Sequence, residues 1–283
     1  MATVAVAFLA RGADDGWDAS CARFLASYRR YRPGIDHLLY VIFKGFSDAC
    51  ALNEAENLFK GVRQTPVFLD DNSFDIGAYI ECADQISEDL ICVLNTSSEV
   101  LADDWLWKLA KNLTQPNVGL VGATASYESL EELNNGFPVF PNIHIRSNAF
   151  MIDRNLFRHI TEGLVVSEKI DTFRFESGAQ SLTRQIIAMG REVLLVGRNG
   201  RGYSPKWWPV SNTFRQGAQS NLLIADNQTR NFAANSWPEK REIALTTWGQ
   251  YINGGELLDN ESVKGISKRR GLFPRRWTVL RSE

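Results

Sequence analysis

Short apolar runs alternate along most of the chain with segments in which apolar side chains recur at helical spacing. Runs typical of buried strands stand at residues 3–9, 38–43, 62–69, 90–94, 118–123, 144–152 and 192–196. Segments of helical spacing stand at residues 17–31, 47–59, 74–86, 102–113, 153–160 and 173–190, followed by 219–234 and 238–251. This alternation predicts an α/β fold: a mostly parallel twisted sheet with right-handed crossovers, flanked by helices, and a C-terminal helical segment.

The most informative pattern lies between residues 71 and 113. A polar loop leads into a helical segment, and then come the apolar run at 90–94, a polar cluster and an amphipathic helical segment. Because the run at 90–94 is apolar on both faces, we expect it to be a central strand. The polar cluster, Asn95 to Glu99, then lies at the carboxyl end of that strand, where open α/β sheets bind ligands.

Two loops are candidates for the same region. Residues 124–142 carry little pattern, and a loop of this length inside a compact domain is usually functional or mobile. Residues 198–209 are rich in Gly, Arg and Trp. Trp207 and Trp208, beside Tyr203, could stack on a sugar ring or could pack in the core.

Composition narrows the class of protein. The 283 residues allow one large domain or two modest ones, and a hydrophobic content of 44% with 23% charged residues supports a packed core. The net charge of −2 gives no reason to expect a nucleic-acid partner. Four scattered cysteines favour reduced side chains in a cytoplasmic protein. We find neither a signal-peptide pattern nor an apolar run near the ~18 residues that span a membrane.

The chain changes character after residue 255. From Ser262 onward basic residues dominate, and Glu283 is the acidic residue among them. We interpret residues 256–283 as a basic tail or linker. It could be a solvated terminus, a contact with an anionic membrane surface worth about 1 kcal/mol per basic residue, or a connection to a further domain.

Several motifs in order resemble a known family. They begin with Asp75-Ile76-Gly77-Ala78, Leu94-Asn95-Thr96-Ser97-Ser98-Glu99, Trp105 and the run Pro116-Asn117-Val118-Gly119-Leu120-Val121-Gly122. They continue with Asn148-Ala149-Phe150-Met151-Ile152, Phe175-Glu176, Leu182, Arg184 and Gly190. Together they cover about residues 3–200 and resemble family-2-type glycosyltransferases with the GT-A fold, of the bacterial rhamnosyltransferase-like kind.

The resemblance implies a transferase. It would move a sugar from a nucleotide-sugar donor to a glycan or lipid-linked acceptor, with inversion, in polysaccharide biosynthesis in the cytoplasm or at the inner membrane face. Residues 1–255 would form one GT-A-like domain, with a nucleotide-sugar-binding half at about 1–123 and an acceptor half with C-terminal helices at 124–255.

Three positions depart from the family's acidic pattern. The place after the second strand, where members carry an aspartate that meets the nucleobase, reads Phe43-Lys44-Gly45-Phe46-Ser47-Asp48. Ser97 stands where the metal-binding aspartate would be, and Ser177 follows Glu176 where members have an aspartate. Metal dependence and the ordinary nucleobase contact are therefore open.

Glycosyl transfer needs a base for the acceptor hydroxyl and a counter-charge for the leaving diphosphate. Glu176 is the candidate base, since neighbouring aromatic residues could desolvate it; the alternative is a glutamate that complements a helix N-terminus. Contacts to the donor are expected from the loop and strand-end residues Arg11, Asp71, Asp75, Asn95, Ser97, Arg146 and Arg201. Asp75 could instead be a helix N-cap.

The counter-charge has two possible sources. A Mn²⁺ or Mg²⁺ ion needs hard oxygen ligands. Glu99 is the carboxylate left in the polar cluster, and His144 is a weaker candidate that could equally be structural. Without a metal, Arg146, Arg201 and Lys206 are the cations that could reach the phosphates.

A second class of function stays open. A protein that kept the fold but lost its acidic residues could be a catalytically silent module that binds nucleotide or carbohydrate. A nucleotidyltransferase is disfavoured, because the chain lacks a Gly-rich, Lys-containing phosphate loop near its N-terminus.

Overall fold

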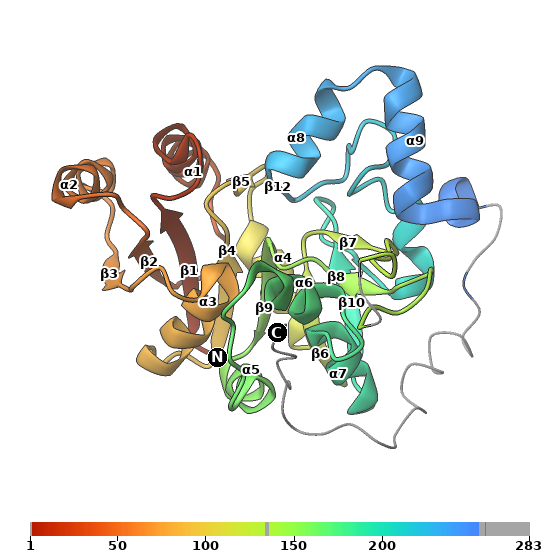
Figure 1. Cartoon of the computed structure of the whole chain (residues 1–283), viewed down its shortest axis with the longest axis horizontal. Helices are drawn as coiled ribbons and strands as arrows, with labels where there is room; N and C mark the ends of the chain where they lie inside the picture. The colour runs from red at the N-terminus through yellow and green to blue at the C-terminus, as the bar shows by residue number, and fades with distance from the viewer. Residues whose placement is uncertain (1, 134–135, 255–257, 259–283) are drawn as a thin grey trace, which may run out of the picture.

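One eight-stranded sheet organises the molecule (Figure 1). The computed structural model describes residues 2–133, 136–254 and 258. Across the sheet the strand order is β11-β10-β6-β9-β4-β1-β2-β3. The strands are β1 (Val4–Arg11), β2 (Leu38–Lys44), β3 (Thr65–Phe68), β4 (Leu90–Leu94), β6 (Val118–Gly122), β9 (Ala149–Asp153), β10 (Glu192–Val196) and β11 (Gly202–Tyr203).

Most neighbouring strands run parallel. The parallel pairs are β1 with β2, β1 with β4, β2 with β3, and β6 with β10. Strand β9 is antiparallel to both β4 and β6, between which it lies. The expected mostly parallel α/β sheet is therefore confirmed, and the run at 90–94 is indeed a central, fully buried strand.

Helices cover both faces of the sheet because its strands alternate between two apolar layers. In β1, Ala5, Ala7 and Leu9 face one layer, while Val6 and Phe8 face the other. The first layer packs on α3 (Phe74–Gln85), α5 (Arg154–Thr161), α6 (Lys169–Ser177) and α7 (Leu182–Ala188). The second packs on α1 (Trp17–Arg30), α2 (Ala49–Leu58) and α4 (Trp105–Leu113).

The C-terminal part reaches back to the centre of the sheet. Short strand β12 (Ile224–Ala225) pairs with β5 (Glu99–Val100), directly after the polar cluster. It leads into α8 (Asn227–Ala234), which stands beside β5 and β12 in Figure 1, and then into α9 (Trp237–Trp248), which lies next to α8. The remaining elements are β7 (Ala125–Ser126), β8 (His144–Ile145), η1 (Pro205–Val210) and η2 (Gly249–Gly254).

Three expected elements differ in detail. Residues 144–152 form two strands, β8 and β9, because the chain turns between them and pairs each with a different sheet. The helix expected from residue 47 is capped by Asp48, whose Oδ1 accepts the N–H of Ala51. Residues 173–190 contain the end of α6 and all of α7.

Among the residues described, no helix has both the length and the apolar character needed to cross a membrane. The expected basic tail at 256–283 lies, apart from Leu258, outside the described residues.

Candidate active site

Three charged residues meet where β1, β2 and β3 end. Arg11 closes β1, Lys44 closes β2, and Asp71 follows β3. Arg11 donates from Nε and Nη2 to the two oxygens of Asp71, at 3.0 and 2.9 Å. Lys44 Nζ lies 3.4 Å from Asp71 Oδ1 and donates to the carbonyl of Phe74 at 2.6 Å. The structure thus brings together Arg11 and Asp71, and adds Lys44, which sequence reasoning had placed directly after the second strand without a role.

Burial and pairing set the charges of this group. Desolvation alone would raise the pKa of Asp71, but the hydrogen bond and charge of Arg11 outweigh it, so the pKa lies below its usual value. Burial lowers the pKa of Lys44, and the charge of Asp71 opposes that change. The Lys44 side chain is fully buried, and Asp71 is the counter-charge that offsets the cost of burying its ammonium group.

A hollow of about 440 Å³ opens beside these three residues. Its walls include the aromatic rings of Phe43, Phe46 and Phe68, together with Lys44 and Asp71. The rings of Phe43 and Phe68 are stacked, with centroids 5.6 Å apart. The hollow therefore offers flat apolar walls next to fixed charges.

Asp75 lies in the first turn of α3, and its Oδ1 accepts the N–H of Ile76 at 3.0 Å. Desolvation, and then the negative charge of Glu176, raise the pKa of Asp75 to about 6. The N-cap position of α3 belongs to Ser73, so the alternative role of Asp75 as an N-cap is wrong.

Glu176 lies in the last turn of α6, not at a helix N-terminus, which rules out the macrodipole alternative. Its Oε2 accepts hydrogen bonds from the N–H and the hydroxyl of Ser147, both at 2.6 Å. Because one oxygen is held by two donors, the carboxylate has a fixed orientation. Its charge acts on Asp75, His144 and Arg146, which places all four in one cluster.

Arg146 and Asp226 form a buried ion pair within the same cluster. Arg146 Nη1 lies 2.8 Å from Asp226 Oδ2, and its guanidinium stacks on Phe214 at 4.3 Å. The carboxylate of Asp226 has no exposed surface and also caps α8 through the N–H of Thr229. Burial would raise the pKa of Asp226, but the charge of Arg146 outweighs it and lowers the pKa.

His144 is buried on β8, with Nδ1 2.8 Å from the carbonyl oxygen of Asn142. Burial lowers its pKa, while the charge of Glu176 opposes that effect. A neutral imidazole held by its own strand fits the structural alternative for this residue as well as the weak metal-ligand one.

The polar cluster after β4, which we call the strand tip (residues 95–99), is internally bonded. Asn95 Oδ1 accepts the hydroxyl of Ser98 at 2.9 Å. The carbonyl of Ser97 accepts from Arg230 Nη2 at 3.1 Å, and Glu99 Oε2 accepts from Arg230 Nη1 at 3.3 Å. Sequence reasoning missed Arg230 because it lies on α8, 131 residues from Glu99.

The contacts that Arg201 makes do not place it in this group. It is exposed on the loop before β11, where its guanidinium lies 5.5 Å from the Tyr203 ring. Trp208 is buried and donates from Nε1 to the Tyr203 carbonyl, so it belongs to the core, whereas Trp207 is 41% exposed.

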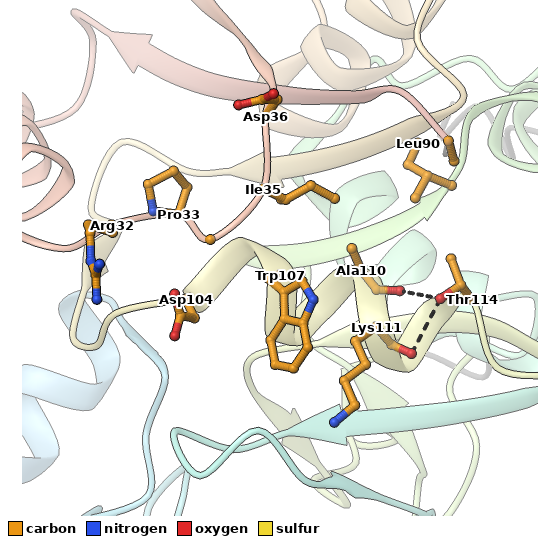
Figure 2. A pocket seen from close by; sticks show the side chains of 12 residues that line it. Arg32, Pro33, Ile35, Asp36, Leu90, Asp104, Trp107, Ala110, Lys111 and Thr114 are labelled. Atoms are coloured by element: carbon orange, nitrogen blue, oxygen red, sulfur yellow. Dashed lines mark hydrogen bonds between the residues drawn. The ribbon is translucent and has the colours of Figure 1, made fainter.

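A larger hollow of about 780 Å³ lies at the opposite edge of the sheet (Figure 2). It is lined by Ala2 and Leu90 near strand starts, by the loop 32–36, and by α4 residues including Trp107 and Lys111. Hydrogen bonds from the N–H groups of Asp104 and Trp107 to the carbonyls of Arg32 and Pro33 hold the loop against α4. None of the predicted site residues lines it.

No protein-family model matches the sequence, and no curated protein matches it significantly. Solved structures with a similar chain arrangement include a mannosyltransferase from Pyrobaculum calidifontis in complex with GDP-mannose and Mn²⁺. It shares 13% identity over 69% of this chain and 54% of its own, with a TM-score of 0.45, so this chain spans about half its length.

Two others are mouse xyloside xylosyltransferase 1 and a CMP:2-keto-3-deoxy-manno-octonic acid synthetase complexed with CTP. The first shares 13% identity over 67% of this chain and 82% of its own, with a TM-score of 0.41. The second shares 10% identity over 68% of this chain and 88% of its own, with a TM-score of 0.44. At these identities and TM-scores the likeness is partial.

Proposed function

We propose that this protein is a glycosyltransferase that binds a nucleotide sugar at the carboxyl edge of a GT-A-like sheet. The observation that carries the proposal is the division of that edge into two adjoining groups. One is a hollow with aromatic walls beside Arg11, Lys44 and Asp71. The other holds two interacting carboxylates, Asp75 and Glu176. The first group suits a nucleotide, and the second suits a sugar and its acceptor.

The hollow is proposed to take the nucleobase and ribose. A planar base can stack on its aromatic walls, and the cations beside it can bind ribose or phosphate oxygens. The carboxylate that the sequence lacks after β2 comes from elsewhere: a Cβ added to Gly45 would lie 2.9 Å from Asp71 Oδ2. Asp71, which follows β3, thus lies against the loop where a nucleobase-binding aspartate was expected.

Glu176 is proposed as the general base. Ser147 holds Oε2, so Oε1 can take the proton of an acceptor hydroxyl. As that proton moves to Glu176, the acceptor oxygen attacks the anomeric carbon from the side opposite the diphosphate. The bond from the anomeric carbon to the diphosphate oxygen breaks, and the nucleoside diphosphate leaves with the electron pair. Configuration at the anomeric carbon is inverted in this single displacement.

Asp75 is proposed to bind a hydroxyl of the donor sugar. Its carboxylate is close enough to Glu176 for the two charges to repel. A sugar hydroxyl that donates to Asp75 would reduce that repulsion, and would fix the ring next to the base. The proposal extends to a glycan or lipid-linked acceptor and to polysaccharide synthesis at the inner face of a membrane.

A panel of nucleotide sugars tests the proposal by thermal shift, each donor with and without Mn²⁺ or Mg²⁺. A ligand at 100 times its Kd adds about 2.7 kcal/mol to the free energy of unfolding, which raises the Tm by several degrees. Donor hydrolysis or transfer is then measured for the donors that bind. If no nucleotide sugar shifts the Tm, the transferase proposal fails. Binding without any turnover would favour a silent binding module instead.

A further inference from the structure

Oxygen atoms of Asn95, Ser97 and Glu99 in the strand tip already accept hydrogen bonds from the protein. Asn95 Oδ1 accepts from Ser98, the Ser97 carbonyl from Arg230, and Glu99 Oε2 from Arg230. Behind them, the carbonyl of Asn148 accepts both the N–H of Asn95 and the hydroxyl of Ser98. These oxygens are therefore engaged with donors of the same chain, whereas the buried hydroxyl of Thr96 has no partner among the described residues.

A divalent cation needs free oxygen lone pairs, with carboxylates preferred. At the tip an ion would have to compete with a guanidinium for Glu99, which is the only carboxylate among residues 95–99. Across the described parts of the chain, no cluster of three or more His, Cys, Asp or Glu residues could hold a metal ion. The residues present at the tip do not fit Mn²⁺ or Mg²⁺.

A fixed cation stands at the tip instead. Helix α8 carries Arg230 and is anchored at its start by the buried Arg146–Asp226 pair. The Arg230 side chain is 30% exposed, so its guanidinium contacts the tip and still has surface open to solvent. Burial and then the positive charge of Arg23, on α1, lower the pKa of Arg230. Since Asp226 is already paired with Arg146, two guanidinium groups against the remaining charge of Glu99 leave an excess of positive charge.

The tip also offers a spare hydrogen-bond donor. Asn148 is 3% exposed, and its Oδ1 accepts the hydroxyl of Thr124. Its Nδ2 is buried and has no partner among the described residues. A buried N–H without a partner is costly, and an oxygen of a bound anion would satisfy it. Donors and positive charge suit phosphate oxygens, not a metal.

We propose that the strand tip binds the diphosphate of the donor through protein cations without a divalent ion, with Arg230 as the counter-charge. Glu99 is then a positioning residue that holds Arg230, and not a metal ligand. This inference rests on the proposed function, since it assigns the phosphates of the same donor. Guanidinium groups match phosphate oxygens in two-pronged geometry and stabilise the charge that develops on the leaving group.

Calorimetric titration of nucleoside diphosphates and pyrophosphate into the full chain tests the inference. Each titration is run with excess EDTA and again with Mn²⁺ or Mg²⁺. We expect wild-type affinities to agree within about threefold between the two conditions. R230M should weaken binding about tenfold or more in both, in line with the loss of a charged hydrogen bond. R230K should retain part of the affinity, and R241M, an exposed arginine on α9, is the matched control.

Glu99→Gln distinguishes the two roles by sign. An amide oxygen can still hold Arg230 but no longer neutralises it, so we expect diphosphate to bind two- to tenfold more tightly, as expected for removal of a nearby like charge. A metal ligand would show the opposite: affinity lost in Mn²⁺. Folding of each variant is checked by its Tm, and E99Q keeps the test decisive if R230M does not fold.

The outcomes separate this inference from the proposed function. If wild type binds nucleoside diphosphates only when Mn²⁺ or Mg²⁺ is added, or if R230M binds like wild type, the metal-free site is overturned while the transferase proposal stands. If wild type binds neither nucleoside diphosphates nor pyrophosphate under any condition, both fall. Metal-independent binding that R230M abolishes supports both.

Discussion

The two edges of the sheet differ in the size of their hollows and in the burial of their charges. The amino edge has the larger hollow, about 780 Å³, yet its charges are exposed: Arg32 and Asp103 lie 3.8 Å apart with side chains 81% and 52% accessible. The carboxyl edge has a hollow of about 440 Å³, but its ion pairs include the fully buried side chains of Lys44 and Asp226. The larger hollow and the buried ion pairs thus lie at opposite edges of the sheet.

The two edges therefore differ in how much free energy it costs to keep their charges where they are. An exposed ion pair contributes only about 0–1 kcal/mol to stability, so its position says little about function. A buried charge costs several kcal/mol unless a partner and hydrogen bonds compensate it. Desolvated charges, paired at one edge and interacting across elements far apart in sequence, are typical of functional sites. Four pairs of substitutions, with one member at each edge, test this contrast.

The largest effect is expected from Asp226→Ala. It leaves Arg146 buried without its ion-pair partner, so we expect the free energy of unfolding to fall by about 3–5 kcal/mol. Urea denaturation measures it. Asp84→Ala, in the exposed pair with Arg158 on the amino-edge side, should cost less than about 1 kcal/mol. Equal losses in the two variants would contradict the contrast.

Glu176→Gln comes next. If Glu176 is the base, kcat for sugar transfer should fall by about 10²–10⁴-fold, while the Kd for the donor changes little. The matched control is Glu192→Gln, at the exposed start of β10 on the amino edge, which should leave kcat unchanged. Transfer that survives Glu176→Gln undiminished would remove Glu176 from the mechanism.

The third test uses pH and Asp75→Asn. The pKa of Asp75 is about 6 in the folded protein against an ordinary value of 3.8, so the folded state binds more protons between these values. The contribution of Asp75 to stability is therefore full below about pH 4 and is lost as pH rises through 6. The free energy of unfolding of Asp75→Asn should therefore rise relative to that of wild type between pH 4 and 7, by about 2–3 kcal/mol.

Asp89, at the amino edge, gives the opposite sign. Backbone and hydroxyl hydrogen bonds from Thr3 lower its pKa, so its contribution is present at neutral pH and is lost as pH falls. The free energy of unfolding of Asp89→Asn should therefore fall relative to that of wild type as pH rises from 3 to 7. The same direction for both variants in denaturation curves would mean that Asp75 is not desolvated as described.

The smallest effects come from one aromatic residue at each edge. Phe68→Ala removes a wall of the carboxyl-edge hollow and should weaken nucleotide binding about two- to tenfold. Trp107→Ala, in the amino-edge hollow, should leave nucleotide affinity unchanged. Both side chains are about half exposed, 53% and 42%, so neither change should unfold the protein. Titration of the nucleotide measures both, and a loss in Trp107→Ala alone would move the site to the other edge.

Much of the sheet could be predicted because strands buried on both faces are continuous apolar runs, as at residues 90–94 and 192–196. The direction of β9 could not, since it depends on the return path of residues 124–148 and not on its own composition. Glu176 was a candidate from local pattern and resemblance, and its role as base stays a prediction. Its partner Ser147 is 29 residues away, and nothing local to either residue indicates the pairing.

Charged partners were hardest to predict. Arg230 and Asp226 belong to a short polar helix that reads as solvated surface, and their partners lie 131 and 80 residues away. Lys44 continues an apolar strand, so its pattern shows burial without showing Asp71. Hydrophobic periodicity records which side chains leave water, but it does not record which charges meet afterwards.

The ladder between β5 and β12 has a consequence for how the protein is made. Val100 pairs with Ile224, and the Ser97 carbonyl accepts from Arg230, which lies 133 residues later in the chain. At ribosomal speeds of about 5–20 residues per second, about 6–27 seconds separate the emergence of these partners. The central strands can assemble in that interval, whereas the tip is completed only by late-arriving chain. A chain that stops before α8 lacks the guanidinium of Arg230, so the proposed diphosphate site would be completed only after synthesis of that helix.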